Sequence, residues 1–333
     1  MKRTAVLGAG SWGSALAVHL ARAGHEVRLW ARDAAFVQEL RSSRENARYL
    51  PGVPMPDAIA ATDSLQEAVR DARFVVLAVP SHGLRAVARR LEPHLARGTI
   101  LVSATKGLEV DTLQRMSEVI GEETKGCCTT VVLSGPSFAA EVALGLPAAV
   151  LAASTTSDSA AAVQEHFRGR GLRLYVNDDV VGVEIGGAMK NVIAIAAGCV
   201  EGLGLGHNAL AALITRGLAE ITRLAIAVGG RRETLAGLSG LGDLVLTCTG
   251  DLSRNRRVGI ELGRGRQIDE ILSGMRMVAE GVRTTRAALA LGARHGIELP
   301  IAAQMQEVLD GRTPPLRAVE TLMLRRQRAE VDG

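Results

Sequence analysis

Short apolar runs alternate with segments of helical periodicity through the first half of the chain. The strand-like runs lie at residues 5–7, 27–30, 74–79, 100–102, 131–133 and 148–151. The segment at 12–23 has helical spacing and ends at Gly24. Strands that are apolar throughout, with helices between them, are typical of a parallel sheet covered on both faces. The pattern therefore predicts an α/β fold whose N-terminal part is doubly wound.

The pattern changes near residue 178, and strand-like runs almost disappear beyond it. Long apolar helical segments follow, at residues 183–200, 210–228, 267–272 and 284–295. The polar residues Asn177, Asp178 and Asp179 are more typical of a helix cap than of a flexible linker. We therefore expect two domains, an α/β domain at residues 1–180 and an all-helical domain at residues 181–333.

The composition is that of an ordinary globular protein. Of 333 residues, 47% are apolar and 22% charged, which is enough apolar material for two cores. The most apolar stretch, residues 192–213, is broken by Glu201 and His207, so we expect buried helices there rather than a membrane span. Only 2% of the residues are aromatic, which argues against base stacking on single-stranded nucleic acid. We expect neither stable membrane insertion nor a nucleic-acid partner.

Charge, cysteines and the N-terminus narrow the class further. The net charge of +4 is small, and modest positive charge suits an anionic cofactor and an anionic substrate. The four cysteines form no CxxC pair, and the chain has no Cys/His cluster, HExxH helix or GxSxG turn. Met1 leads almost directly into the first strand, without a signal peptide. These features predict a reduced cytoplasmic protein without a metal site.

A glycine pattern follows the first strand and opens the first helix. Residues 8–13, Gly-Ala-Gly-Ser-Trp-Gly, match GxGxxG in the strand–turn–helix context that dinucleotide-binding sites require. Gly8 permits the tight turn, Gly10 lets a pyrophosphate approach the backbone, and Gly13 lets helix and strand pack closely. N–H groups at the helix N-terminus would bind the phosphates. A plain glycine-rich turn is the alternative, but the context favours a Rossmann-type cofactor domain.

The end of the second strand bears on the choice of cofactor. An acidic residue at this place binds the adenosine ribose in NAD-dependent Rossmann folds. This chain has Arg32, whose guanidinium matches the 2′-phosphate of NADPH. Asp33 follows immediately and is able to serve NADH. We therefore expect NADPH to be preferred and NADH to be possible.

Two polar segments follow later strands, at the sheet edge where doubly wound folds bind ligands. Lys106 comes after the strand at 100–102 and is expected to face the ligand, unless it is an ordinary surface lysine. Residues 134–139, Ser-Gly-Pro-Ser-Phe-Ala, form a loop-to-helix turn whose hydroxyl and N–H groups suit a polar substrate or the nicotinamide amide. A simple N-cap of the next helix explains this segment equally well.

Lys190 is the most unusual charged residue of the helical half. It lies within an apolar helical segment, residues 187–192. Burial disfavours an ammonium and lowers its pKa toward neutrality, which suits acid–base chemistry near pH 7. The alternative is a lysine on a helix edge whose ammonium reaches solvent.

A last group of polar residues suggests a phosphate site. Asp243 is expected in a glycine-rich turn at residues 238–244. Ser253, Arg254 and Asn255 open a helical segment, where a hydroxyl, a guanidinium, an amide and a helix N-terminus come together. An ordinary helix cap is the alternative for these three residues.

Taken together, these motifs resemble the NAD(P)-dependent glycerol-3-phosphate dehydrogenase family of bacterial type. The resemblance runs from the glycine loop to residues 278–281, Val-Ala-Glu-Gly, and covers nearly the whole chain. Its motifs, in chain order, are Lys106-Gly107, Ser134-Gly135-Pro136-Ser137, Lys190-Asn191, Gly242-Asp243 and Ser253-Arg254-Asn255. The resemblance implies reversible hydride transfer between NAD(P)H and dihydroxyacetone phosphate, which gives sn-glycerol 3-phosphate for glycerophospholipid synthesis. It also implies a two-domain cytoplasmic protein, usually a homodimer.

The resemblance further implies roles for individual residues. Lys190 would be the catalytic acid–base residue. The residues implied to hold the substrate are Lys106, Gly135, Ser137, Lys190, Asp243, Ser253, Arg254 and Asn255. Besides Gly8, Gly10 and Gly13 of the loop, those implied to contact the cofactor are Ser11, Trp12, Arg32, Lys106, Ala139, Arg254, Val278 and Glu280.

Two other functions compete with this interpretation. One is a dehydrogenase of similar domain structure that acts on a 3-hydroxy acid, and a phosphate site at residues 253–255 argues against it. The other is a non-catalytic dinucleotide sensor, which would need the glycine loop but not Lys106, Lys190 and Asp243 together. A substrate panel with and without phosphate separates the first, and a test for NADPH oxidation separates the second.

Overall fold

The N-terminal half forms one sheet with helices on both faces. The computed structural model describes residues 3–275, 279–327 and 329. The strands are β1 (Thr4–Leu7), β2 (Val27–Trp30), β3 (Ile59–Thr62), β4 (Phe74–Leu77), β5 (Ile100–Ser103), β6 (Thr129–Ser134), β7 (Ala148–Ala153) and β8 (Leu172–Asn177). Their order across the sheet is β3-β2-β1-β4-β5-β6-β7-β8. The helices that alternate with them are α1 (Ser11–Arg22), α2 (Ala34–Ser43), α3 (Leu65–Val69), α4 (Ser81–Leu91), α5 (Met116–Glu123), α6 (Ala139–Leu144) and α7 (Ser157–His166).

Alternate strand residues supply two apolar layers, one on each face of the sheet. Val6 and Val76 point into a cluster that includes Leu16 of α1. Their neighbours Leu7 and Leu77 belong to a second cluster with Leu84 and Ile120 of α4 and α5. Strands that are buried on both faces explain the continuous apolar runs in the sequence. The predicted doubly wound fold is confirmed.

The sheet differs from the predicted one in three places. The pairing of β6 with β7 is antiparallel, whereas all other neighbouring pairs are parallel as predicted. The strands β3 and β8 were not predicted, and they are the two edges of the sheet. β8 alternates buried and exposed residues at Leu172, Arg173, Leu174 and Tyr175 because one of its faces meets solvent. An edge strand of this kind lacks the continuous apolar run on which the prediction depended.

The sheet order places a crevice beside the first strand. β1 pairs with β2 on one side and with β4 on the other, in matching parallel registers. The chain order of the strands therefore reverses between β1 and β4. Doubly wound folds bind their ligands outside the carboxyl ends of the strands at such a switch point. Both the glycine loop after β1 and the Lys106 segment after β5 start from this edge.

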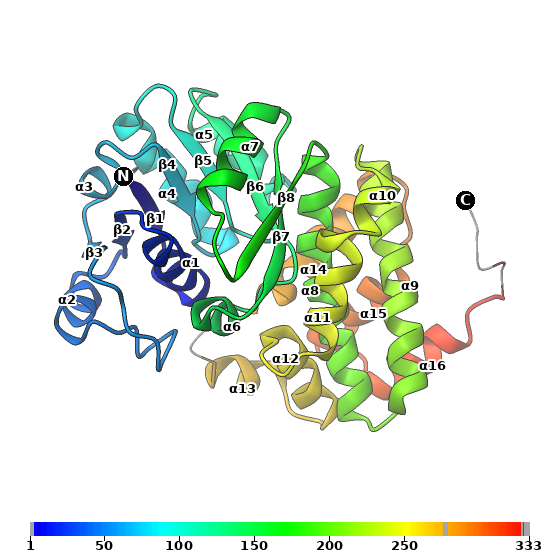
Figure 1. Cartoon of the computed structure of the whole chain (residues 1–333). Coiled ribbons are helices and arrows are strands. Elements are labelled where there is room, and N and C mark those ends of the chain that lie inside the picture. The colour runs from blue at the N-terminus through cyan, green and yellow to red at the C-terminus, as the bar shows by residue number, and fades with distance from the viewer. Residues whose placement is uncertain (1–2, 276–278, 328, 330–333) are drawn as a thin grey trace.

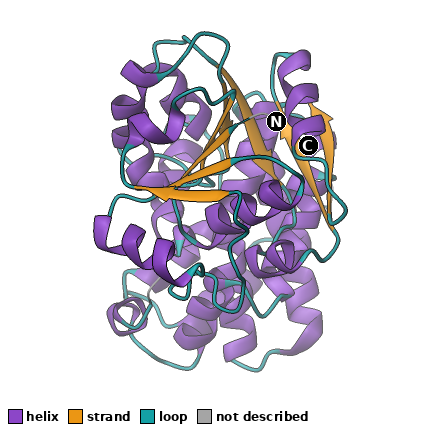
Figure 2. Ribbon diagram, turned by 60° about the vertical axis from the view of Figure 1, so that its left-hand side comes forward, coloured by secondary structure: helices purple, strands orange, loops and turns teal. Residues whose placement is uncertain are grey.

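The second half is helical throughout its described residues. Its helices are α8 (Val180–Gly202), α9 (Gly206–Ala227), α10 (Arg232–Leu235), a π-helical turn η2 (Leu238–Gly242), α11 (Asp243–Thr249), α12 (Arg254–Gly263), α13 (Ile268–Ser273), α14 (Glu280–Arg294), α15 (Pro300–Leu309) and α16 (Pro315–Met323). Figure 1 shows the sheet in the left part of the molecule, with α8, α9 and α11 to its right and α12 and α13 below it. In Figure 2 all strands gather at one end.

The long helix α8 is the centre of the helical half. Asp179 caps its start, because the Asp179 carboxylate accepts hydrogen bonds from the N–H groups of Gly182 and Arg231, both at 2.8 Å. The predicted cap before this helix is confirmed. α8 is long and apolar enough to cross a membrane, but 89% of its most apolar stretch is buried inside the protein. It is a core helix, surrounded by α9, α11, α12 and α14.

Glycines let α12 lie unusually close to α8. A Cβ on Gly198 would be 2.0 Å from the carbonyl oxygen of Arg256, and a Cβ on Gly259 would be 1.9 Å from that of Ile195. Neither position has room for a side chain. This close contact fixes the N-terminal end of α12, with Ser253 and Arg254, relative to α8 and therefore to Lys190.

Candidate active site

The glycine loop has the conformation that its sequence predicts. Gly8 has φ +114°, a value that side chains rarely allow. A Cβ on Gly13 would lie 1.9 Å from the Gly8 carbonyl oxygen, so helix α1 can pack against the loop only without one. A Cβ on Gly10 would meet no atom within 4 Å, which leaves the backbone open to an approaching ligand. The buried indole Nε1 of Trp12 has no hydrogen-bond partner among the described residues. The loop therefore fits a dinucleotide.

The two charged residues after β2 differ in their contacts. Asp33 is the N-cap of α2 and accepts hydrogen bonds from the N–H groups of Ala35 at 3.0 Å and Phe36 at 3.4 Å. Its second oxygen lies 3.9 Å from Arg48. Arg32 is exposed, and its guanidinium forms no ion pair with the residues that the structure describes. Of the two, Arg32 is the residue whose charge is available to a ligand.

Two lysines meet on one buried carboxylate. Lys190 of α8 donates to Oδ1 of Asp243 at 2.6 Å, and Lys106 donates to Oδ2 of the same residue at 2.6 Å. The Asp243 side chain is 1% exposed, and that of Lys190 is 9% exposed. Lys106 also donates to the carbonyl oxygen of Gly135 at 3.2 Å. The ends of β5 and β6 are thereby joined to α8 and α11 through a chain of charged hydrogen bonds.

Burial sets the protonation of this group. Loss of hydration is the main cause that lowers the pKa of Lys190, and the Lys106 charge lowers it as well, while Asp243 opposes both; the resulting pKa is about 8. Burial alone raises the pKa of Asp243, but the two ammonium groups hold it below its ordinary value. At neutral pH the carboxylate is thus ionised, and the Lys190 ammonium is close to releasing its proton. The ammonium is buried, so the alternative of a lysine that reaches solvent is wrong.

The structure corrects the predicted surroundings of Asp243. The sequence predicted a glycine-rich turn, whereas residues 238–242 form the π-helical turn η2 and Asp243 is the first residue of α11. Thr247 lies one turn later on the same helix and was not predicted. Its hydroxyl accepts a hydrogen bond from Lys190 at 2.9 Å and donates to the Asp243 carbonyl oxygen at 2.6 Å. Asp243 and Thr247 are four residues apart, so they lie on one face of a helix. This spacing was the signal in the sequence that could have revealed Thr247 as a neighbour of the site.

The turn after β6 is a loop and not a side-chain cap. Phe138 occupies the N-cap position of α6, and no side chain caps that helix. The Ser137 hydroxyl donates instead to the Gly135 carbonyl oxygen at 2.9 Å. Gly135 has φ +134°, and Ala139 is the first residue of α6. The N-cap explanation of this segment is therefore wrong, and Gly135 and Ser137 lie next to Lys106.

The start of α12 is tied to α8 and α14. Ser253 caps α12 by accepting from the Arg256 N–H at 3.2 Å, so the helix-cap interpretation is correct for this hydroxyl. The buried amide of Asn255 donates to Asn191 Oδ1 at 3.0 Å and accepts from the Gly281 N–H at 3.0 Å. Asn191 follows Lys190, so the Asn255 amide holds α12 beside the lysine pair.

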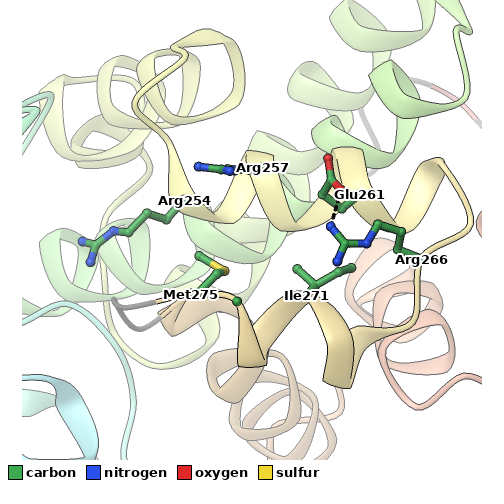
Figure 3. Close-up of a pocket in the computed structure, with 7 residues that line it drawn as sticks. Arg254, Arg257, Glu261, Arg266, Ile271 and Met275 are labelled. Atoms are coloured by element: carbon green, nitrogen blue, oxygen red, sulfur yellow. Dashed lines mark hydrogen bonds and ion pairs between the residues drawn. The ribbon is translucent and has the colours of Figure 1, made fainter.

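Arg254 and Glu280 differ in their hydrogen bonds, although the Glu280 charge opposes the effect of burial on the pKa of Arg254. Figure 3 shows Arg254 extending from the first turn of α12, and its guanidinium forms no hydrogen bond within the described residues. The Glu280 carboxylate accepts from the Ser81 N–H at 3.0 Å and from the Ser81 hydroxyl at 2.5 Å. It therefore joins α14 to the start of α4.

Ser11 is the first residue of α1. Val278, the remaining predicted cofactor contact, lies outside the described residues.

A second buried carboxylate supports the segment that carries Lys106. Glu184 of α8 accepts from Arg115 at 2.7 Å and from the Ser117 N–H at 2.8 Å. Arg115 forms a β-bridge with Leu108, two residues after Lys106. Sequence reasoning missed this contact, because a glutamate inside an apolar helix does not reveal its partner.

Known proteins match both halves of the chain. Residues 3–160 match the family described as NAD-dependent glycerol-3-phosphate dehydrogenase N-terminus, and residues 179–320 match the corresponding C-terminus. The chain belongs to the NAD-dependent glycerol-3-phosphate dehydrogenase family. The predicted resemblance is thereby confirmed. Its members are NAD(P)-dependent oxidoreductases, which agrees with the glycine loop.

Individual relatives extend over most of the chain. A protein from Geobacter sulfurreducens, named glycerol-3-phosphate dehydrogenase (NAD(P)+), is 54% identical over 275 residues, which is 81% of this chain and 82% of the relative. One of the same name from Koribacter versatilis is 53% identical over 277 residues, 82% of each chain. The crystal structure of glycerol-3-phosphate dehydrogenase from Coxiella burnetii has a TM-score of 0.94 at 42% identity and covers 97% of this chain and 99% of its own.

Proposed function

We propose that this chain reduces dihydroxyacetone phosphate to sn-glycerol 3-phosphate, with NADPH as its preferred cofactor and NADH as a possible one. The observation that carries the proposal is the buried Lys190 ammonium, held at 2.6 Å from Asp243 and with a pKa lowered to about 8. An acid with a pKa near the working pH transfers protons efficiently. The names of the relatives support the same substrate.

The residues of the site divide the reaction between them. NADPH, when bound, supplies the hydride that reduces the carbonyl carbon. Lys190 donates its proton to the carbonyl oxygen as negative charge develops there, a contribution of roughly 10²- to 10⁴-fold. Lys106 adds a second positive charge near that oxygen. Asp243 keeps both ammonium groups in place by accepting one hydrogen bond from each.

The remaining predicted residues bind and orient. Arg254, at the N-terminus of α12, anchors the substrate phosphate, and its binding energy helps to orient the carbonyl. Gly135 and Ser137 line the same space beside Lys106. Gly8, Gly10 and Gly13 accommodate the cofactor pyrophosphate, and Arg32 binds the 2′-phosphate of NADPH.

A spectrophotometric assay tests this proposal. Purified protein should oxidise NADPH in the presence of dihydroxyacetone phosphate and far more slowly with dihydroxyacetone, which lacks the phosphate. Lys190→Ala should bind NADPH nearly as the wild type does and lose most turnover. The exposed Lys125 supplies a matched control, and Lys125→Ala should keep full activity. Near-normal turnover of Lys190→Ala would contradict the assigned role.

The wider context follows from the family. We propose that the product serves glycerophospholipid synthesis, that the enzyme works in the cytoplasm, and that it is a homodimer. We also propose a cofactor domain at residues 1–180 and a substrate domain at residues 181–333, since the sheet ends at Asn177 and α8 begins at Val180. A cell that lacks this gene should require external glycerol 3-phosphate for lipid synthesis. Light scattering should give twice the mass of one chain.

A further inference from the structure

A buried asparagine from the loop between α2 and β3 contacts the glycine loop. Asn46 is 1% exposed, and its side-chain NH₂ group donates to the Ala9 carbonyl oxygen at 2.9 Å and to the Ser14 hydroxyl at 2.7 Å. The amide oxygen of Asn46 accepts from the Tyr49 N–H at 3.1 Å. The Ala9 carbonyl can only accept and the Tyr49 N–H can only donate, so these two partners fix which way the amide is turned.

The loop that carries Asn46 is itself held in place. Arg44 donates to the carbonyl oxygens of Met55 at 3.2 Å and Ile59 at 3.0 Å, at the far end of the loop. The Leu50 N–H donates to the carbonyl oxygen of Asn46 at 2.8 Å and closes a turn. Residues on both sides of Asn46 are therefore fixed without a ligand, so its side chain has a defined position beside the glycine loop.

The contact with Ala9 sets the direction of the next N–H group in the chain. The described residues contain no cis peptide bond, so the bond between Ala9 and Gly10 is trans. In a planar trans peptide the C=O and N–H groups point in opposite directions. Because the Ala9 carbonyl is turned toward Asn46, the Gly10 N–H points away from Asn46. It forms no backbone hydrogen bond within the part of the chain that the structure describes.

The direction of this N–H group matters because of where it lies. Gly10 is the N-cap of α1, and no side chain caps this helix. The first N–H groups of a helix have no partner within it and favour phosphate. If the peptide between Ala9 and Gly10 turned over, a carbonyl oxygen would take the place of the N–H group. That oxygen carries partial negative charge and would repel the pyrophosphate of the cofactor.

We propose that Asn46 is a positioning residue for the cofactor, which holds the peptide between Ala9 and Gly10 with its N–H group toward the pyrophosphate. The proposal depends on cofactor binding by the glycine loop and not on the identity of the substrate. NADPH and NADH carry the same pyrophosphate, so loss of the Asn46 contact should weaken both by the same factor. This pattern differs from that expected of Arg32, which acts on the 2′-phosphate that only NADPH has.

Fluorescence titration of full-length Asn46→Ser with NADPH and with NADH tests the proposal. A serine hydroxyl at this place is able to accept from the Tyr49 N–H, as in other short polar turns, but is too short to reach the Ala9 carbonyl oxygen. The Kd for each cofactor should rise about tenfold, since a hydrogen bond to a charged group is lost or weakened. The titration contains no substrate, so its result stands even if the proposed reaction fails. In the assay, the KM for dihydroxyacetone phosphate should change little.

Ser14→Ala is the matched control, because it removes the other partner of the Asn46 NH₂ group and leaves the contact with Ala9 in place. Both variants should be less stable in denaturant titration, whereas only Asn46→Ser should bind the cofactors more weakly. Equal rises in Kd for the two variants, an unchanged Kd in Asn46→Ser, or a rise confined to NADPH would overturn the proposal.

A crystal structure of the wild type with NADPH tests the same geometry without a variant. The Gly10 N–H should lie within hydrogen-bond distance of a pyrophosphate oxygen, and the Ala9 carbonyl should still accept from Asn46. A complex in which this N–H group points away from the pyrophosphate would overturn the proposal, even if Asn46→Ser does not fold.

Discussion

Replacing Asp243 with asparagine tests the electrostatic coupling within the lysine pair. The substitution keeps the size of the side chain and removes the carboxylate that Lys106 and Lys190 each contact at 2.6 Å. The Asp243 side chain is only 1% exposed. Water therefore cannot reach the two ammonium groups to stabilise their charge in place of the carboxylate. Asp243 is the group that opposes the effect of burial on the pKa of Lys190. The pKa of Lys190 must therefore fall further in Asp243→Asn.

The size of the effect follows from the lost ion pair. Two unit charges about 4 Å apart contribute about 4 kcal/mol at an effective dielectric constant of about 20. Such an energy corresponds to about three powers of ten in a protonation equilibrium. The Lys190 pKa is about 8 in the wild type, so roughly nine tenths of Lys190 is protonated at pH 7. In the variant, roughly one part in a hundred of Lys190 would be protonated at pH 7. The kcat for ketone reduction at pH 7 should fall on the order of 100-fold.

The assay is the kcat for NADPH-dependent reduction, measured at saturating substrate between pH 5 and pH 9. In Asp243→Asn the pH above which kcat declines should move to lower pH, and part of the activity should return in acid. Asp57→Asn at a fully exposed aspartate is the control and should match the wild type. Circular dichroism confirms that the variant is folded. A folded Asp243→Asn protein whose kcat declines at the wild-type pH would refute the coupling.

Three further substitutions separate binding, cofactor choice and stability. Arg254→Ala should raise the KM for dihydroxyacetone phosphate by roughly 10- to 100-fold at nearly constant kcat, since a hydrogen bond to a charged group contributes about 1.5–3 kcal/mol. A change confined to kcat would contradict the anchoring role. Arg32→Asp should raise the KM for NADPH far more than that for NADH, and equal increases would contradict a 2′-phosphate contact. Glu184→Ala, which breaks the buried contact with Arg115, should lower the free energy of unfolding by about 3 kcal/mol. Glu118→Ala removes a more exposed partner of the same arginine and a hydrogen bond from the Arg115 N–H at the start of α5, and it should cost only about 1 kcal/mol. Equal losses in denaturant titration would refute the distinction.

Local patterns predicted much of this fold. Continuous apolar runs identified β1, β4, β5, β6 and β7 because these strands are buried on both faces. β2 was identified from three apolar residues although Arg28 interrupts them. The glycine loop was predictable because the positive φ of Gly8 and the contact of Gly13 with the Gly8 carbonyl oxygen both arise within six consecutive residues. The edge strand β8 was missed because solvent on one side makes its residues alternate between buried and exposed. The edge strand β3 was missed because it is short and half alanine, a residue that is depleted in strands. The antiparallel pairing of β6 with β7 was missed because periodicity carries no strand direction.

The site was predictable as a set of residues but not as an arrangement. A lysine in an apolar helix signals a perturbed pKa, and the burial of Lys190 confirms this part of the prediction. The shared partner could not be derived, because Asp243 lies 53 positions from Lys190 and 137 from Lys106 along the chain. The Glu184–Arg115 contact, between residues 69 positions apart, was hidden for the same reason. Contacts of this length depend on the packing of α8 against the sheet.

The central claim is that Lys190 is the proton donor, and the pH dependence of kcat in both directions tests it most directly. Ketone reduction needs the ammonium, which is present below the Lys190 pKa of about 8 and lost above it. Oxidation of sn-glycerol 3-phosphate needs the neutral amine, so its kcat should rise through the same pH. The account predicts two profiles of opposite sign, each with its midpoint near pH 8. Profiles that share one sign, or that show no change near pH 8, would contradict it.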